Sequence, residues 1–254
     1  MSNGDIKVDL ATDHVATIEM CRGPNNFFDT ALIESLGDAL NELAEDQCRA
    51  VVLCSEGRNF CAGARLESTS SSDAAQAPHL YDVAITLFEQ PLPIVAAVQG
   101  AAVGGGLGLA LAADFRIAAE DSRFTASFAR LGFHHGFGMT ATLPNVIGAQ
   151  ATLDLLYTGR NVGAAEAKSL GLCDEVVPAD ELRARARARA HAIAQSAPLA
   201  VRSIRATMRR TLVDEVRLAV SRERSEQERL MATADFTEGV TAMSERRDPD
   251  FHGV

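Results

Sequence analysis

The amino-acid sequence lacks the segments that would place a protein in or across a membrane. It contains no run of about 18 apolar residues, the length that a membrane-spanning helix needs. Its first ten residues, MSNGDIKVDL, lack the basic and apolar regions of a secretory signal peptide. Apolar residues nevertheless make up 47% of the 254 positions, enough for a sizeable core in one large domain. We therefore expect a cytoplasmic protein with no membrane partner.

Patterns typical of a metal site, a disulfide framework or a nucleic-acid interface are also missing. The number of cysteines is odd, five, and no C-x-x-C pair occurs. With 24 basic and 34 acidic residues, the net charge of −10 argues against nucleic acid as a partner, because such binding depends on neutralising phosphates. A phosphorylated small molecule held by a few arginines remains compatible with this charge. We expect no metal, and reduced, mostly buried thiols at Cys21, Cys48, Cys54, Cys61 and Cys173.

The glycine-rich stretch at 100–108 does not match the common nucleotide-binding motifs. A dinucleotide fingerprint, G-x-G-x-x-G/A, would need a small residue where the chain has Leu109, counting from Gly104, or Leu111, counting from Gly106. The Gly-Lys-Ser/Thr of a P-loop is absent as well.

This stretch instead has the features of a buried strand followed by a helix with an open first turn. Residues 94–98 are apolar and β-branched, which predicts a buried strand. The four glycines that follow cost about 0.5–1 kcal/mol each relative to alanine in a helix, so something must offset that cost. Glycines in a first helical turn let a ligand oxygen reach free N–H groups, which can hold an oxyanion. The alternative is that they only allow close helix packing. The glycines are Gly104, Gly105, Gly106 and Gly108.

Apolar spacing elsewhere predicts alternating strands and helices, which indicates the α/β class. Asp29 has the position of a helix cap, and Pro198 that of a first helical residue. His14 is interpreted as a surface strand residue. We expect strands at 6–10, 14–20, 50–54, 94–98, 114–119 and 173–177. We expect helices at 30–43, 81–90, 104–113, 182–193, 198–212 (with Ile204, Met208 and Leu212 at helical spacing), 213–231, and from Asp235 and Glu238 to about Arg246.

Two motifs resemble those of the crotonase superfamily, the enoyl-CoA hydratase/isomerase family. They are FCAGARL at 60–66 and PIVAAVQGAAVGGGLGLALAADFRIA at 93–118, and the similarity extends to GLCDEVVP at 171–178 and SERRDPDF at 244–251. The resemblance implies a spiral of ββα units in two sheets, here residues 1–195, and a C-terminal helical trimerisation region, here 196–254. It also implies a coenzyme A thioester as substrate with no permanently bound cofactor, and a homotrimer, in some members a dimer of trimers.

The resemblance assigns roles to individual residues. In the family two backbone N–H groups bind the thioester oxygen, and the matching residues are Ala64 and Gly105, in agreement with the open helical turn. The implied substrate-binding residues are Ala62, Gly63, Leu66, Gly104, Phe128, Leu131 and Gly136. The implied contacts to the adenine and phosphate end of coenzyme A are Arg22, Asn25, Phe27 and Arg246.

The sequence departs from the family pattern at both glutamates with which hydratases activate water. The matching positions are Gly108 and Phe128, so classical hydration is not expected, and isomerase or other lyase-type chemistry on an enoyl-CoA is favoured. A glycine-punctuated loop at 128–138 contains His134 and His135, and histidine suits α-proton abstraction near neutral pH. We expect His135, or secondarily His134, to be the base. The alternative is a non-catalytic acyl-CoA-binding protein in which neither histidine reaches the substrate.

Overall fold

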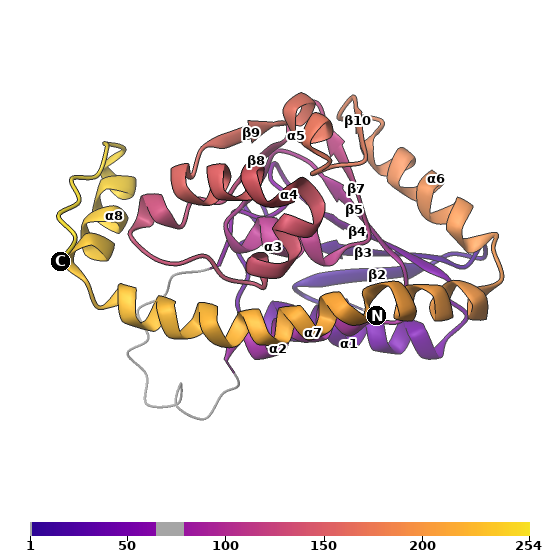
Figure 1. The fold of residues 1–254 in the computed structure, drawn as a ribbon. Coiled ribbons are helices and arrows are strands. Elements are labelled where there is room, and N and C mark those ends of the chain that lie inside the picture. The colour runs from indigo at the N-terminus through magenta and orange to yellow at the C-terminus, as the bar shows by residue number, and fades with distance from the viewer. Residues whose placement is uncertain (1, 65–78) are drawn as a thin grey trace.

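The computed structural model describes residues 2–64 and 79–254, which contain two β-sheets (Figure 1). The larger sheet has the order β1-β2-β3-β4-β5-β7-β10 and the smaller the order β6-β8-β9. From β3 to β10 the neighbouring strands of the larger sheet run parallel. The strands are β1 Ser2–Asn3, β2 Ile6–Leu10, β3 Val15–Met20, β4 Ala50–Ser55, β5 Ile94–Val98, β6 Ala101–Val103, β7 Phe115–Ala119, β8 Arg123–Thr125, β9 Asn161–Gly163 and β10 Glu175–Val177.

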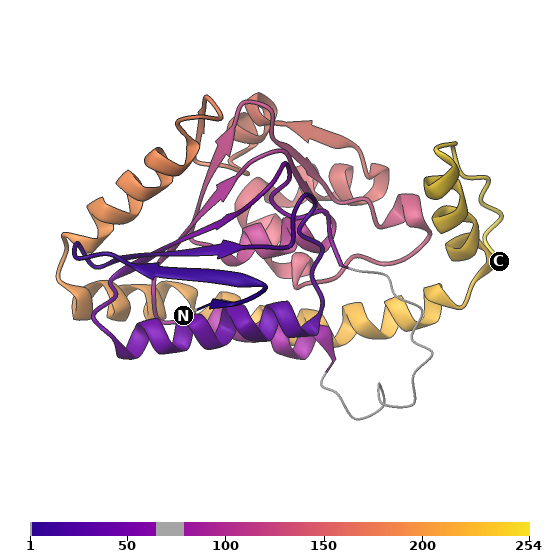
Figure 2. The same cartoon turned by 180° about the vertical axis from the view of Figure 1, so that it is seen from behind.

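Helices cover both faces of the larger sheet. Helix α6 packs its small residues, such as Ala186 and Ala190, on one face, while α1, α2 and α3 pack leucines on the other. Figures 1 and 2 show α7 running the length of the molecule beside α1 and α2. The α/β class with two sheets and C-terminal helices is thereby confirmed. The helices are α1 Thr30–Glu45, α2 Leu80–Glu89, α3 Gly105–Ala112, the 3₁₀ helix η2 Ala129–Leu131, α4 Met139–Thr158, α5 Ala164–Leu170, α6 Leu182–Ala194, α7 Pro198–Met231 and α8 Ala234–Glu245.

The predicted elements that have strong local signals in the sequence are confirmed. Several short elements without such signals were not predicted. Asp29 caps α1 by accepting a hydrogen bond from the N–H of Leu32 at 3.0 Å. The three strands of the smaller sheet were not predicted, because each has only three residues and shows no periodicity. The assignment of His14 to a strand was wrong, since its φ of 64° places it in the turn before β3. The cap of the last helix is Thr233, whose hydroxyl accepts from Phe236, and not Asp235.

Helix α7 also differs from the prediction, in two ways. It is one helix of 34 residues where two were expected. Of the three apolar residues at four-residue spacing that predicted its first half, Leu212 packs against the core, but the other two do not face it. Ile204 is 62% exposed and Met208 76% exposed, and Leu218 lies within the same arc of the helix. The inward face instead carries arginines in the first half, Val216 and Val220 in the middle, and two polar residues near the end.

The inward arginines of α7 stabilise the fold by binding the C-terminal ends of three other helices. Carbonyl groups at a helix C-terminus lack intrahelical partners and carry the negative end of the helix dipole, so a guanidinium group stabilises them. Two of these arginines also share the half-buried carboxylate of Asp114. This arrangement explains why charged residues face the core here. The pairs are Arg202 with the carbonyls of Ala44 and Cys48, Arg205 with that of Gln90, and Arg209 with that of Ala112.

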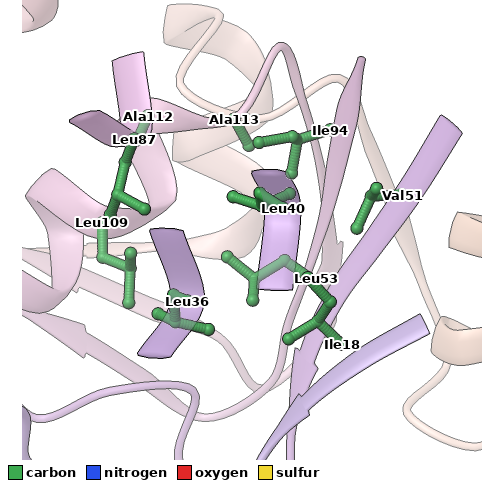
Figure 3. Close-up of a pocket in the computed structure, with 10 residues that line it drawn as sticks. All are labelled: Ile18, Leu36, Leu40, Val51, Leu53, Leu87, Ile94, Leu109, Ala112 and Ala113. Atoms are coloured by element: carbon green, nitrogen blue, oxygen red, sulfur yellow. The ribbon is translucent and has the colours of Figure 1, made fainter. Parts of the chain in front are cut away.

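A small apolar cavity lies between the larger sheet and helices α1, α2 and α3 (Figure 3). Aliphatic side chains from these elements point into it, and none of them offers a polar group to a ligand. The cavity is therefore a packing gap behind α3 and not a site for a thioester. Its lining residues are Ile18, Leu36, Leu40, Val51, Leu53, Leu87, Ile94, Leu109, Ala112 and Ala113.

Candidate active site

The segment from Cys61 to Ala64 lies between β6 and the chain at Phe28. On one side Cys61 exchanges hydrogen bonds with β6, donating to Ala101 and accepting from Val103, both at 3.0 Å. On the other side Phe28 donates to the carbonyl of Gly63 at 3.1 Å and forms a parallel bridge with Ala64. In a parallel bridge of this register Phe28 uses both its N–H and its C=O, so the N–H of Ala64 faces away from Phe28. No described residue accepts a hydrogen bond from that N–H group.

Helix α3 starts beside this segment with an open first turn. Gly104, at a φ of 55°, donates to the carbonyl of Thr125 at 2.8 Å and forms the N-cap. The N–H of Gly105 comes next, and it too has no acceptor among the described residues. Among residues 104–112 only Gly105 is not buried. The positive end of the helix dipole and a free donor therefore meet at the one accessible residue of this helix.

Close packing explains why glycines are needed here. A Cβ on Gly105 would lie 2.5 Å from Cζ of Phe28. A Cβ on Gly106 would overlap the carbonyl oxygen of Cys61 and lie 2.8 Å from its carbonyl carbon. The first turn of α3 thus contacts the backbone of the segment that carries Ala64, and both expected reasons for the glycines, close packing and free donors, apply. The oxyanion role of Ala64 and Gly105 stays a prediction.

A first aromatic wall, formed by Phe28, Phe88 and Phe137, covers one side of α3. The ring centroid of Phe137 lies 5.5 Å from that of Phe28 and 6.3 Å from that of Phe88, both in edge-on geometry. Phe137 also lies against Gly108, where a Cβ would come within 2.6 Å of its own Cβ. Gly108, which the resemblance matches to the first family glutamate, is thus packed under an aromatic ring and has no room for a side chain.

A second aromatic wall, formed by Phe128, Phe133 and Phe236, reaches the start of α3 through Phe128. Successive ring centroids are 5.4 Å and 5.3 Å apart. Cζ of Phe128 lies 3.7 Å from the place where a Cβ on Gly104 would be, so this ring stands next to the start of α3. Phe128, which the resemblance matches to the second family glutamate, is an apolar group and is 6% exposed.

The two histidines lie on the loop between the walls and contact α4 and α7. Nε2 of His135 lies 2.8 Å from Oγ1 of Thr140, which donates to Oε1 of Glu223 at 2.7 Å. Burial lowers the pKa of His135 to about 4, so its ring is neutral at pH 7. Burial also raises the pKa of the fully buried Glu223, against hydrogen bonds that favour its charged form. Nδ1 of His134 bonds to the carbonyl of His135, and the two rings stack at 4.1 Å.

A second polar chain fixes the same loop from α2. The hydroxyl of Tyr81 donates to Oε1 of Gln227, whose Nε2 donates to the carbonyl of His134, each at 2.8 Å. Tyr81 packs so closely on Gly136 that any side chain there would overlap the hydroxyl. The sequence reasoning missed Tyr81, Gln227, Thr140 and Glu223. Glu223 and Gln227 are four residues apart on a long charged helix, so nothing in the sequence distinguishes them from solvent-exposed residues.

The residues expected to contact coenzyme A are spread over the loops around this site. Arg22 is already paired with two carboxylates, Asp5 at 2.6 Å and Asp29 at 2.7 Å, which compete with any phosphate. The carbonyl of Asn25 accepts from Ala62 at 2.9 Å, so this asparagine supports the segment of Cys61 to Ala64.

Other expected ligand contacts have the following positions. Phe27 is 37% exposed, and Arg246 is the exposed, left-handed C-cap of α8. Gly63 is buried with a φ of 110°, Leu131 lies in η2 against Gly239 of α8, and Leu66 lies outside the described residues. These roles in ligand binding stay predictions.

Within residues 2–64 and 79–254, no three His, Cys, Asp or Glu side chains come together as a set that could hold a metal ion. No helix in these same ranges combines the length and the apolar character needed to cross a bilayer.

Comparison with known proteins gives one consistent result. Residues 11–254 match the family model described as enoyl-CoA hydratase/isomerase. A probable enoyl-CoA hydratase of Rhodobacter capsulatus is 34% identical over 90% of this chain and 90% of its own. An enoyl-CoA isomerase/hydratase of Mycosarcoma maydis is 35% identical, over 81% of this chain and 77% of its own. The crystal structure of an enoyl-CoA hydratase/isomerase from Pseudoalteromonas atlantica superposes with a TM-score of 0.89 at 31% identity, over 98% of this chain and 100% of that one.

Proposed function

The chain belongs to the enoyl-CoA hydratase/isomerase family, and from this premise we propose that a thioester oxygen binds between the N–H groups of Ala64 and Gly105. The observation that carries the proposal is that neither N–H group donates to a described residue, although their segments pack against each other. Removing a proton α to a thioester places negative charge on this oxygen. Each preorganised donor of this kind stabilises such a charge by about 3–4 kcal/mol.

We propose proton transfer on an enoyl-CoA, as in an isomerase or another lyase-type step, in place of hydration. Syn addition of water needs groups that hold and activate the water, and the family positions for these groups, Gly108 and Phe128, carry no carboxylate. The two aromatic walls border the region around Gly108 and Phe128. His135, neutral at pH 7, is the proposed base.

A non-catalytic acyl-CoA-binding protein is the second candidate. It is favoured by one specific observation, the packing of Phe137 over Gly108, which fills the space of a catalytic side chain. Such a protein would keep the two N–H donors and bind thioesters without changing them.

Proton exchange separates these candidates. The protein is incubated in deuterated water with a panel of acyl- and enoyl-CoA thioesters, and the α-protons are followed by NMR. The enzyme predicts exchange or isomerisation that His135→Ala abolishes, while His252→Ala, at a ring 71% exposed in the C-terminal tail, leaves it unchanged. Binding by calorimetry with no exchange across the panel supports the binding protein. Absence of both binding and exchange refutes the thioester site itself.

We also propose that the chain forms a homotrimer, alone or as a dimer of trimers. The support is the outward face of α7, where large apolar side chains point away from the core of this chain. Burying such residues against another copy removes apolar surface from water. The residues are Ile204, Met208 and Leu218.

A further inference from the structure

A continuous chain of hydrogen bonds joins His135, Thr140 and Glu223, which come from a loop and two helices. His135 lies on the loop before α4, Thr140 in the first turn of α4, and Glu223 on the inward face of α7. We propose that Glu223, acting through Thr140, fixes the ring proton of His135 on Nε2 and so leaves Nδ1 as the basic nitrogen. This inference rests on the proposed function, in which His135 accepts a proton from the substrate. Glu223 and Thr140 are positioning residues.

The direction of each hydrogen bond follows from what each group can donate. Oε2 of Glu223 accepts the N–H of Gly138 at 2.8 Å, and Oε1 accepts the N–H of Thr140 at 2.9 Å. Both oxygens are thus occupied by backbone donors, which favours the carboxylate form. A carboxylate only accepts, so the single hydroxyl proton of Thr140 points at Glu223. The hydroxyl oxygen can then only accept from His135, which places the proton of the neutral ring on Nε2.

The other ring nitrogen of His135, Nδ1, is free to accept a proton. Among the described residues, none forms a hydrogen bond with Nδ1 of His135. His134 has the opposite arrangement, because its Nδ1 must donate to a carbonyl, which only accepts, and its basic nitrogen is therefore Nε2. The titratable groups that face this ring are His134 on the same loop, stacked on it at 4.1 Å, and Glu223 on α7, while Tyr81 on α2 lies against the neighbouring Gly136 with its hydroxyl held by Gln227.

The proton step balances with the groups named. The C–H bond α to the thioester breaks, its proton goes to Nδ1 of His135, and its electron pair moves to the thioester oxygen at Ala64 and Gly105. The imidazolium keeps its Nε2–H bond to Thr140, and Nε2 lies 3.9 Å from Oε1 of Glu223. Return of the proton to another carbon completes an isomerisation. A carboxylate behind the base stabilises the imidazolium, as in a Ser-His-Asp triad, with a hydroxyl inserted between the two.

The ring proton can be located in the free protein, without any substrate. Protein labelled with ¹⁵N-histidine is examined at about pH 7, where an unperturbed imidazole is largely neutral, by long-range ¹⁵N–¹H correlation, which distinguishes protonated from unprotonated ring nitrogens. Comparison with His135→Ala identifies the signals of His135. We expect the proton on Nε2. A proton on Nδ1 in the unmodified protein overturns the proposal, whatever the variants do.

Variants of Thr140 test the link to catalysis. Thr140→Val keeps the shape and the backbone N–H bond to Glu223 but removes the hydroxyl, whereas Thr140→Ser retains it. We expect Thr140→Val to give a mixture of tautomers of the His135 ring and to slow α-proton exchange about tenfold to a hundredfold. We expect Ser to keep both properties near those of the unmodified protein. Thermal unfolding of the two variants shows whether each is folded at the assay temperature.

The failure of this inference is distinguishable from failure of the proposed function. If His135→Ala leaves exchange intact, the proposed base is wrong. If His135→Ala abolishes exchange but Thr140→Val changes neither the tautomer nor the rate, the base stands and the role of Thr140 and Glu223 is refuted. If Thr140→Val and Thr140→Ser slow exchange equally, the hydroxyl of Thr140 is not the group that matters, and the proposal also fails.

Discussion

Substituting Gly106 by alanine should damage stability and the candidate site together. In a helix interior the change normally stabilises by about 0.5–1 kcal/mol. Here the new Cβ overlaps the carbonyl oxygen of Cys61, which also accepts the N–H of Val103. Overpacking costs about 1–3 kcal/mol, and a lost hydrogen bond about 1 kcal/mol. The expected net loss is about 1–3 kcal/mol, a fall in Tm of roughly 3–10 °C for a chain of this size.

The same substitution should also weaken catalysis, because the displaced backbone carries Ala64. Moving one donor away from the other sacrifices part of the roughly 3–4 kcal/mol that each supplies, so α-proton exchange should fall at least about tenfold. Gly37→Ala in α1 is the matched control, since its Cβ would meet only the hydroxyl of Thr86 at 3.2 Å. Thermal unfolding by circular dichroism and exchange by NMR are measured for both variants. If Gly106→Ala matches Gly37→Ala in both, the close contact between α3 and the Cys61 segment is wrong.

Three further perturbations test other parts of the structure. Because burial lowers the pKa of His135 to about 4 and the base must be neutral, exchange should persist as the pH falls below 6 and be lost near pH 4; loss near 6.5, the value of an exposed histidine, contradicts this. Arg205→Met should lower Tm by roughly 6–12 °C through loss of about 3 kcal/mol, whereas the exposed Arg210→Met should have little effect; equal effects would count against the role of the inward arginines. Ile204→Glu with Met208→Glu should shift light-scattering mass towards the monomer, and an unchanged mass refutes the proposed interface.

The local features of the fold were readable in the sequence because each depends on neighbouring residues. The cap at Asp29, the strand at 94–98 and the glycine-rich first turn of α3 were all recognised. The orientation of α7 was not, because its inward arginines bind carbonyl groups of three helices distant in the sequence. Spacing indicates a helix but does not say which face meets the core. Apolar residues such as Met208 therefore suggested the wrong face.

The candidate site was predictable only where backbone geometry defines it. The segments of Ala64 and Gly105 have recognisable glycines, and the structure places them in contact. The polar chain behind His135 joins residues whose sequence positions differ by 83 and 85, Thr140 and Gly138 to Glu223. No periodicity relates them, and a glutamate on a long charged helix looks like a solvent-exposed residue. Its role is visible only once α4 and α7 are side by side.

The aromatic walls bear on the kind of base that this site can use. A carboxylate between them would be ionised before the reaction and would suffer the full cost of desolvation in the resting protein. A neutral imidazole carries no charge until it takes the proton. In the proposed reaction charge then appears as a pair, an enolate at the N–H groups of Ala64 and Gly105 and an imidazolium at His135. In the proposal the one charge needed beforehand, on Glu223, lies behind Thr140, where two N–H groups at the start of α4 counter part of the effect of burial, which raises the pKa of this carboxyl. The proposed site is apolar at its aromatic walls, and its polar groups, Thr140 and Glu223, lie behind His135. Such a site suits proton transfer between carbons better than the addition of water.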